Sequence, residues 1–188
     1  MVATNGTDLT GKRDRALMLL GFALAACRSE LVAIDVADLA ECPEGLRVTI
    51  RRSKTDQEGA GAVIAVCKGS VACPISALRE WRVAANITEG PIFRPIGKGG
   101  RLKDTRLTAQ SVALIVKAQA ARLGFDPTAF AGHSLRAGFL TSAAAKGASI
   151  FKMIDVSRHR SVDTLRGYVR DANAFRDHAG PGCCKGRR

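Results

Sequence analysis

The chain has few of the residues that build metal sites and disulfide frameworks. It contains only three histidines, and none of its six cysteines stands in the Cys-x-x-Cys spacing of a zinc site. Adjacent Cys183 and Cys184 fall in a tail rich in glycine and arginine, where we expect free thiols. The sequence therefore predicts a protein of a reducing compartment that uses no metal and no cofactor.

Hydrophobic runs long enough to cross a bilayer are also missing from the sequence. The apolar segment 17–27 is short and is interrupted by Gly21, whereas a membrane-spanning helix needs about 20 apolar residues. The first residues, Met-Val-Ala-Thr-Asn-Gly, include no basic stretch of the kind that opens a secretory signal. We therefore expect a cytoplasmic protein with no membrane partner.

Acidic residues are scarce relative to basic ones. The 29 lysines and arginines exceed the 17 aspartates and glutamates, which gives a formal charge of +12 that is spread over the whole chain. Such a charge favours a polyanionic partner, and nucleic acid is the commonest one. The alternative is a basic surface that only keeps the protein in solution.

The hydrophobic periodicity predicts a single, mainly helical domain with one small sheet. Ser29 is expected to N-cap a helix that continues to residue 39, and runs 46–51 and 62–66 predict the two strands of a hairpin with Lys54 near its tip. Helical spacing marks the remaining elements, at 14–26, 75–85, 108–123, 134–146 and from 149 onward. The expected fold class is α+β, mainly α, with residues 176–188 as a flexible basic tail.

The single tyrosine, Tyr168, follows two segments that carry histidine and arginine, at 132–136 and 157–161. Tyrosine ionises near pH ~10, so forming a phenolate at neutral pH costs roughly 4 kcal/mol unless cations or a base assist. His159 and Tyr168 are nine residues apart, which on one continuous helix is about 900° of rotation and would place them on opposite faces. Ser161 is positioned to N-cap a separate short helix that carries the tyrosine. A tyrosine that only packs its ring is the simpler interpretation of this residue alone.

Taken in order, these segments resemble the catalytic domain of the tyrosine recombinases, the phage-integrase family of site-specific DNA recombinases. Ala-Cys-Arg-Ser-Glu-Leu at 26–31 resembles the first arginine box of the family, in which Arg-x-Ser/Gly-Glu-Leu is usual. Two departures stand out: no residue intervenes between arginine and serine, and Arg158 occupies a position where glycine is usual. The matching residues are Arg28 in the arginine box, Lys54 on the hairpin, His133 and Arg136 in the His-x-x-Arg box, and His159 with Tyr168 in the final box.

The resemblance implies that residues 1–175 form a catalytic domain, and we expect the N-terminal domain that clamps DNA to be absent from this chain. It implies an enzyme that cuts and rejoins double-stranded DNA through a 3′-phosphotyrosyl intermediate on Tyr168, with Arg28, Lys54, His133, Arg136 and His159 as the other catalytic residues. Lys68 is an alternative to Lys54. A homotetramer on DNA, a monomer without DNA and a location at the bacterial or phage nucleoid are expected. The alternatives are a non-catalytic DNA-binding remnant or accessory protein and a type IB topoisomerase.

Overall fold

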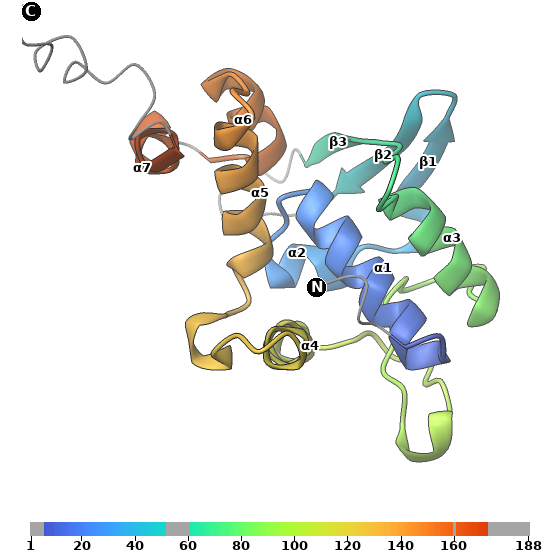
Figure 1. Ribbon diagram of the computed structural model, residues 1–188. Coiled ribbons are helices and arrows are strands. Elements are labelled where there is room, and N and C mark those ends of the chain that lie inside the picture. Colours follow the sequence, from blue (N-terminus) through green and yellow to red (C-terminus); the bar gives the residue numbers. More distant parts are fainter. Residues whose placement is uncertain (1–5, 52–60, 160, 173–188) are drawn as a thin grey trace, which may run out of the picture.

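The computed structural model describes residues 6–51, 61–159 and 161–172, and it shows a mainly helical α+β fold with a small sheet at one edge (Figure 1). The fold class predicted from the sequence is therefore confirmed. The elements are α1 (Leu9–Ala23), α2 (Arg28–Ala33), η2 (Val36–Asp38), β1 (Leu39–Cys42), β2 (Gly45–Ile50), β3 (Ala62–Cys67), α3 (Pro74–Ala84), η3 (Lys98–Gly100), α4 (Ala109–Arg122), η4 (Pro127–Ala129), α5 (Ser134–Ala145), α6 (Ile150–Ser157) and α7 (Val162–Ala172).

The sheet is antiparallel, in the order β1-β2-β3. The predicted hairpin is confirmed, because β2 pairs with β3 from Gly45 opposite Cys67 to Ile50 opposite Ala62. Lys54 lies in the connection between these strands, outside the described residues. Lys68 lies just beyond the other end of the pair, where its Nζ donates a hydrogen bond to the Pro43 carbonyl at 2.8 Å. The two candidate lysines thus belong to opposite ends of the hairpin.

Most of the buried apolar side chains form one main core around α1, which passes through the middle of the fold (Figure 1). The main core includes residues from α1, α2, α3, α4, β2 and β3. It also includes Leu135 at the start of α5. Gly21 on α1 lets two helices approach closely. A Cβ atom at this position would lie 2.8 Å from the side chains of Leu135 and Leu31. The beginnings of α2 and α5 are thereby held against the same point of α1.

The predicted second helix is wrong at both of its ends. Glu30 accepts a hydrogen bond from the Cys27 backbone N–H at 2.8 Å, so the helix begins at Arg28 and Ser29 lies inside it. The helix ends at Ala33 because Ile34 is extended and Asp35 pairs with Pro91. Of the residues that were expected to continue the helix to position 39, Val36–Asp38 form the short 3-10 helix η2 and Leu39 begins strand β1.

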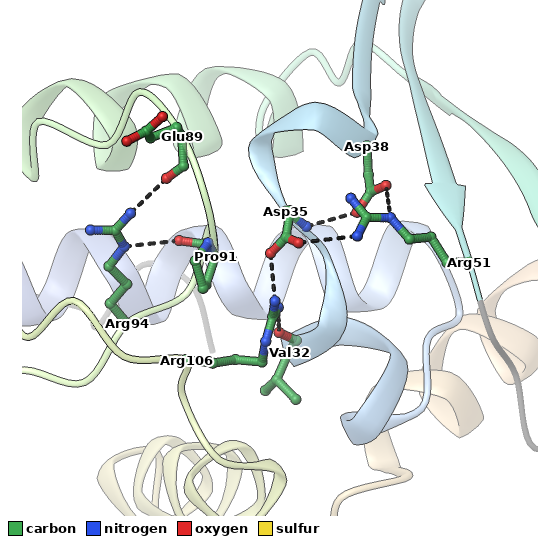
Figure 2. A network of polar contacts seen from close by, with 8 residues as sticks. All are labelled: Val32, Asp35, Asp38, Arg51, Glu89, Pro91, Arg94 and Arg106. Carbon is green, nitrogen blue, oxygen red and sulfur yellow. Dashed lines mark hydrogen bonds and ion pairs between the residues drawn. The ribbon is translucent and has the colours of Figure 1, made fainter.

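Arginines from distant segments hold the chain after α2 in this conformation (Figure 2). Arg51 donates to Asp38 at 2.6 Å and to Asp35 at 3.2 Å, and Arg106 donates to the other oxygen of Asp35 at 2.6 Å and to the Val32 carbonyl at 2.6 Å. The arginine N–H groups thus supply a donor to a free carbonyl at the end of α2 and neutralise two carboxylates. These hydrogen bonds join residues that are far apart in the sequence, so the local sequence pattern does not indicate them. This explains the error in the predicted helix.

The second half of α5 packs with α6 and α7 around a smaller apolar cluster, named here the C-terminal cluster. Its buried members are Leu140, Ala144, Met153 and Leu165. The hydroxyl of Ser161 accepts a hydrogen bond from the Asp163 N–H at 3.1 Å, which caps α7 as predicted. The predicted break between His159 and Tyr168 is therefore present, and the tyrosine lies on its own helix.

Candidate active site

Arg136, on the first turn of α5, is a half-buried cation whose hydrogen-bonding capacity is only partly used. One terminal nitrogen of its guanidinium donates to the Cys27 sulfur at 2.6 Å. Its Nε is shielded from solvent and finds no acceptor among the residues that the structure describes. A buried N–H without an acceptor costs free energy. The arrangement is suited to an anionic ligand that supplies the missing acceptor.

Arg28 and His133 line an open pocket of about 330 Å³ beside this arginine, together with Cys27, Ser29, Ala131 and Gly132. Arg28 is the first residue of α2, and its side chain is exposed. It crosses directly over Gly132, where a Cβ atom would lie 2.5 Å from the Arg28 Cδ. A side chain at position 132 would therefore displace Arg28 from this path.

His133 occupies the N-cap position of α5, yet its side chain makes no capping hydrogen bond. The nearby capping contact is made by Ser134, whose hydroxyl accepts from the Ala131 N–H at 2.8 Å. The imidazole of His133 is consequently left exposed at the edge of the pocket. This placement favours a role with a bound molecule over a purely capping role.

Arg158 connects the end of α6 to the beginning of α2. Its backbone is left-handed, with φ at 57°, a conformation that costs a residue other than glycine about 1–2 kcal/mol. Its guanidinium donates to Glu30 at 2.7 Å and to the carbonyls of Val156 at 2.7 Å and Leu24 at 3.2 Å. Both side chains of the ion pair are almost fully buried. These bonds offset the backbone cost and explain how arginine replaces the usual glycine.

His159 lies next to this connection and close to Arg136. Burial lowers the pKa of the imidazole below its usual 6.5, and the positive charges of Arg136 and Arg158 lower it further, while Glu30 opposes them. Its Nδ1 lies 2.8 Å from the hydroxyl of Ser157. The site therefore favours a neutral His159 near a fixed cation.

Tyr168, on α7, is half-buried and packs against the C-terminal cluster. It lies three residues after the fully buried Leu165 and so shares its helix face. The ring therefore packs against the buried side chains of this cluster. The structure thus joins Arg136 to Cys27 and places Arg28 and His133 around the adjoining pocket. His159 lies near enough to feel the charge of Arg136, and Tyr168 is positioned through packing contacts of its own.

Comparisons with known proteins place the chain in a family, although no protein-family model matches it. It is 44% identical over 173 residues to the integrase/recombinase XerD homolog of Selenomonas ruminantium, covering 91% of this chain and 51% of the relative. It is 32% identical over 161 residues to the tyrosine recombinase XerD of Corynebacterium glutamicum, covering 84% of this chain and 48% of that protein. The chain belongs to the tyrosine recombinase family.

Solved structures support the same fold for this tyrosine recombinase chain. A structure of the XerH site-specific recombinase bound to palindromic difH substrate, in a post-cleavage complex, matches with a TM-score of 0.72 and 16% identity, covering 92% of this chain and 46% of that one. A crystal structure of the XerA recombinase matches with a TM-score of 0.58 and 16% identity, covering 87% of this chain and 57% of that one. The chain spans about half the length of the curated relatives it matches.

Cys27 is a site residue that the sequence reasoning missed. In the arginine box of tyrosine recombinases, the usual Arg-x-Ser-Glu spacing places the arginine three residues before the glutamate. Counting back from Glu30 reaches Cys27, with Arg28 one residue later. The structure agrees with this count, because Cys27 contacts Arg136 whereas Arg28 extends along the pocket toward Gln110. The signal that identifies the shift is the position of Glu30.

Within the parts of the chain that the structure describes, no helix is long and apolar enough to cross a membrane. Over the same residues, no three histidine, cysteine, aspartate or glutamate side chains gather in a way that could hold a metal ion.

Proposed function

We propose that this chain is the catalytic domain of a site-specific DNA recombinase that cuts and rejoins strands through a 3′-phosphotyrosyl intermediate on Tyr168. The observation that carries the proposal is the partly buried guanidinium of Arg136, whose Nε lacks an acceptor among the described residues, beside a pocket lined by Arg28 and His133. Kinship with proteins named as integrases and recombinases supports it. The proposed substrate is double-stranded DNA, which suits a chain of formal charge +12.

The two arginines, Arg28 and Arg136, would bind the non-bridging oxygens of the scissile phosphate. A guanidinium matches phosphate with paired hydrogen bonds, and its charge stabilises the negative charge that develops in the transition state. Arg136 is held in place by Cys27, whereas Arg28 is exposed and makes only a long hydrogen bond of 3.5 Å to Gln110, which a substrate phosphate could replace. We propose that Arg28 serves this purpose despite its shift by one residue in the arginine box.

Tyr168 would attack phosphorus, forming a bond from its phenolic oxygen while the bond to the 5′ oxygen breaks. Lys54 is proposed to protonate that leaving oxygen, and His133 and His159 to bind the phosphate and accept the tyrosine proton. Lys68 is the weaker alternative because its Nζ already binds Pro43. The covalent intermediate keeps the energy of the phosphodiester, so a 5′ hydroxyl of a partner strand can rejoin without ATP.

Recombination joins two duplexes, so we propose that four copies assemble on DNA and that the chain is a monomer without it. The proposed place of action is the nucleoid of a bacterial cell or the DNA of an infecting phage, in the cytoplasm. The relatives are about twice as long as the matched part, which agrees with a catalytic domain that works beside a DNA-clamping domain.

The test is covalent trapping on nicked suicide substrates, including a pool of random sequence, followed by denaturing gels. We expect an adduct with the native chain and none with Tyr168→Phe, which keeps the ring in the C-terminal cluster and removes only the hydroxyl. Arg136→Ala should lower adduct formation by about 10²–10³-fold. Arg101→Ala is the matched control, because it removes the same charge from an exposed position after η3 and should affect binding alone.

The other outcomes separate the alternatives. Salt-sensitive DNA binding without any adduct would favour a DNA-binding remnant or accessory protein, and fusing a clamp domain to the chain would show whether activity returns. Relaxation of supercoiled plasmid by the monomer would favour a topoisomerase. An adduct that persists in Tyr168→Phe would contradict the proposed nucleophile.

A further inference from the structure

Ser157 ends α6 and lies entirely away from solvent, two residues before His159. Its hydroxyl oxygen has two close neighbours, the Met153 carbonyl oxygen at 2.6 Å and the Nδ1 of His159 at 2.8 Å. A hydroxyl has one hydrogen to donate and two lone pairs to accept with. The assignment of that hydrogen decides which nitrogen of the imidazole carries a proton.

The carbonyl of Met153 can only accept a hydrogen bond. Two oxygens at 2.6 Å repel each other unless a hydrogen lies between them, and this distance is normal for an O–H···O bond. The hydroxyl hydrogen of Ser157 is therefore committed to Met153, and the hydroxyl has only lone pairs to offer to His159. The hydrogen in the second contact must then come from Nδ1.

We infer that Ser157 is a positioning residue that holds neutral His159 as the Nδ1–H tautomer, so that Nε2 presents a lone pair to the site. Resting on the proposed function, this assigns His159 the part of proton acceptor toward the nucleophile, because a neutral ring in this tautomer has no hydrogen on Nε2 to donate. The phosphate is then left to the donors, which are Arg136, Arg28 and His133.

The surroundings of the ring agree with a neutral acceptor. Arg136 from α5 and Arg158 after α6 face it with positive charge, while Glu30 from α2 is engaged by Arg158 and by the Cys27 N–H. A second proton on the imidazole would add a third cation to this group. The connection between Arg158 and Glu30 also fixes the backbone on which His159 and Ser157 lie.

Nitrogen NMR of protein labelled with ¹⁵N in the histidine rings tests the tautomer directly at about pH 8, where the ring is neutral. Signals are assigned with His159→Gln and His133→Gln. We expect a proton-bearing Nδ1 and an unprotonated Nε2 for His159, and a change toward the Nε2–H tautomer in Ser157→Ala. Ser157→Thr should keep the native pattern, because its hydroxyl has the same donor and acceptors.

Ser149→Ala is the matched control, since Ser149 caps the start of the same helix and does not contact His159. We expect this variant to loosen α6 without altering the tautomer. An Nε2–H signal in the native protein, or an unchanged signal in Ser157→Ala, would overturn the inference. If Ser157→Ala does not fold, the native spectrum and Ser157→Thr still decide the question.

Suicide-substrate cleavage supplies the functional part of the test. Ser157→Ala should reduce the rate of adduct formation about tenfold, less than the roughly 100-fold or greater loss expected when an acid or base group is removed outright. Ser157→Thr should restore most of it, and equal rates in Ser157→Ala and the native chain would contradict the role. A complete lack of adduct in every variant would count against the proposed function and leave the NMR result standing.

Discussion

The main core and the C-terminal cluster support different parts of the candidate site on very different amounts of buried surface. Among the described residues the main core contains 28 buried apolar side chains, whereas the C-terminal cluster contains four. Arg28 and Arg136 lie on helices whose first turns reach the main core through Leu31 and Leu135. Tyr168 lies on a helix that packs against the small cluster.

The difference indicates that the helices carrying Arg28 and Arg136 are held more firmly than the helix carrying Tyr168. Regions with few buried apolar contacts open at lower free-energy cost than the rest of a protein. α5 belongs to both regions, because Leu135 joins the main core and Leu140 joins the C-terminal cluster. We therefore expect α7, with Tyr168, to open at a lower free-energy cost than the first turns of the helices that carry the two arginines.

The largest effect is expected from Trp81→Ala, which damages the main core. Trp81 is fully buried on α3, and its indole N–H donates to the Ile92 carbonyl at 2.7 Å. Loss of the ring should lower the free energy of unfolding by about 3–5 kcal/mol. Urea denaturation and amide hydrogen exchange should show that all helices lose protection together. Val83→Ala, on the exposed face of the same helix, should change the stability by less than about 0.5 kcal/mol.

A smaller and local effect is expected from Leu165→Ala, which removes the fully buried side chain of α7. A buried Leu→Ala substitution costs about 2–5 kcal/mol, and here the cost should fall on the attachment of α7. Hydrogen exchange should accelerate in α7 while amides of α1 and α3 keep their native rates, and adduct formation should fall. Val162→Ala, at a more exposed position of α7, is the control. Parallel acceleration in α1 would show that the two regions unfold as one.

The sequence predicted the parts of this comparison that depend on local pattern. Strands β2 and β3 and helices α3, α4 and α5 lie within about two residues of their predicted ends, because their periodicity, Pro74 and Thr108 are strong local signals. The first helix begins earlier than predicted, at Leu9, because Asp8 accepts a hydrogen bond from the Gly11 N–H at 2.8 Å. The cap at Ser161 was also predicted correctly.

Contacts between distant segments account for what the sequence did not predict. The end of α2 and the strand β1 depend on Arg51 and Arg106, which lie 16 and 71 residues from Asp35. The contact between Cys27 and Arg136 joins residues 109 positions apart. The roles of the six predicted site residues stay predictions, and Lys54 lies outside the described residues.

The smallest expected effect is a difference in how the two regions respond to acid. In the main core, burial raises the pKa of Asp14 above its usual 3.8, although the adjacent Arg13 opposes this. Beside the C-terminal cluster, burial and two arginines lower the pKa of His159 below 6.5. Asp14 thus binds a proton more tightly in the native state than in the unfolded chain. His159 binds a proton less tightly in the native state than in the unfolded chain.

Because proton binding is linked to folding, the two groups change the free energy of unfolding in opposite directions as the pH falls. The contribution of His159 is complete above about pH 6.5 and is lost as the pH falls toward its native pKa, since the unfolded chain binds more protons there. The contribution of Asp14 grows as the pH falls through its raised pKa and is complete below about pH 3.8. Urea unfolding and hydrogen exchange at a series of pH values should show acid loosening α6 and α7 first. His159→Gln should remove that loosening and Asp14→Asn should not, so an unchanged pH dependence in His159→Gln would exclude this histidine as its source.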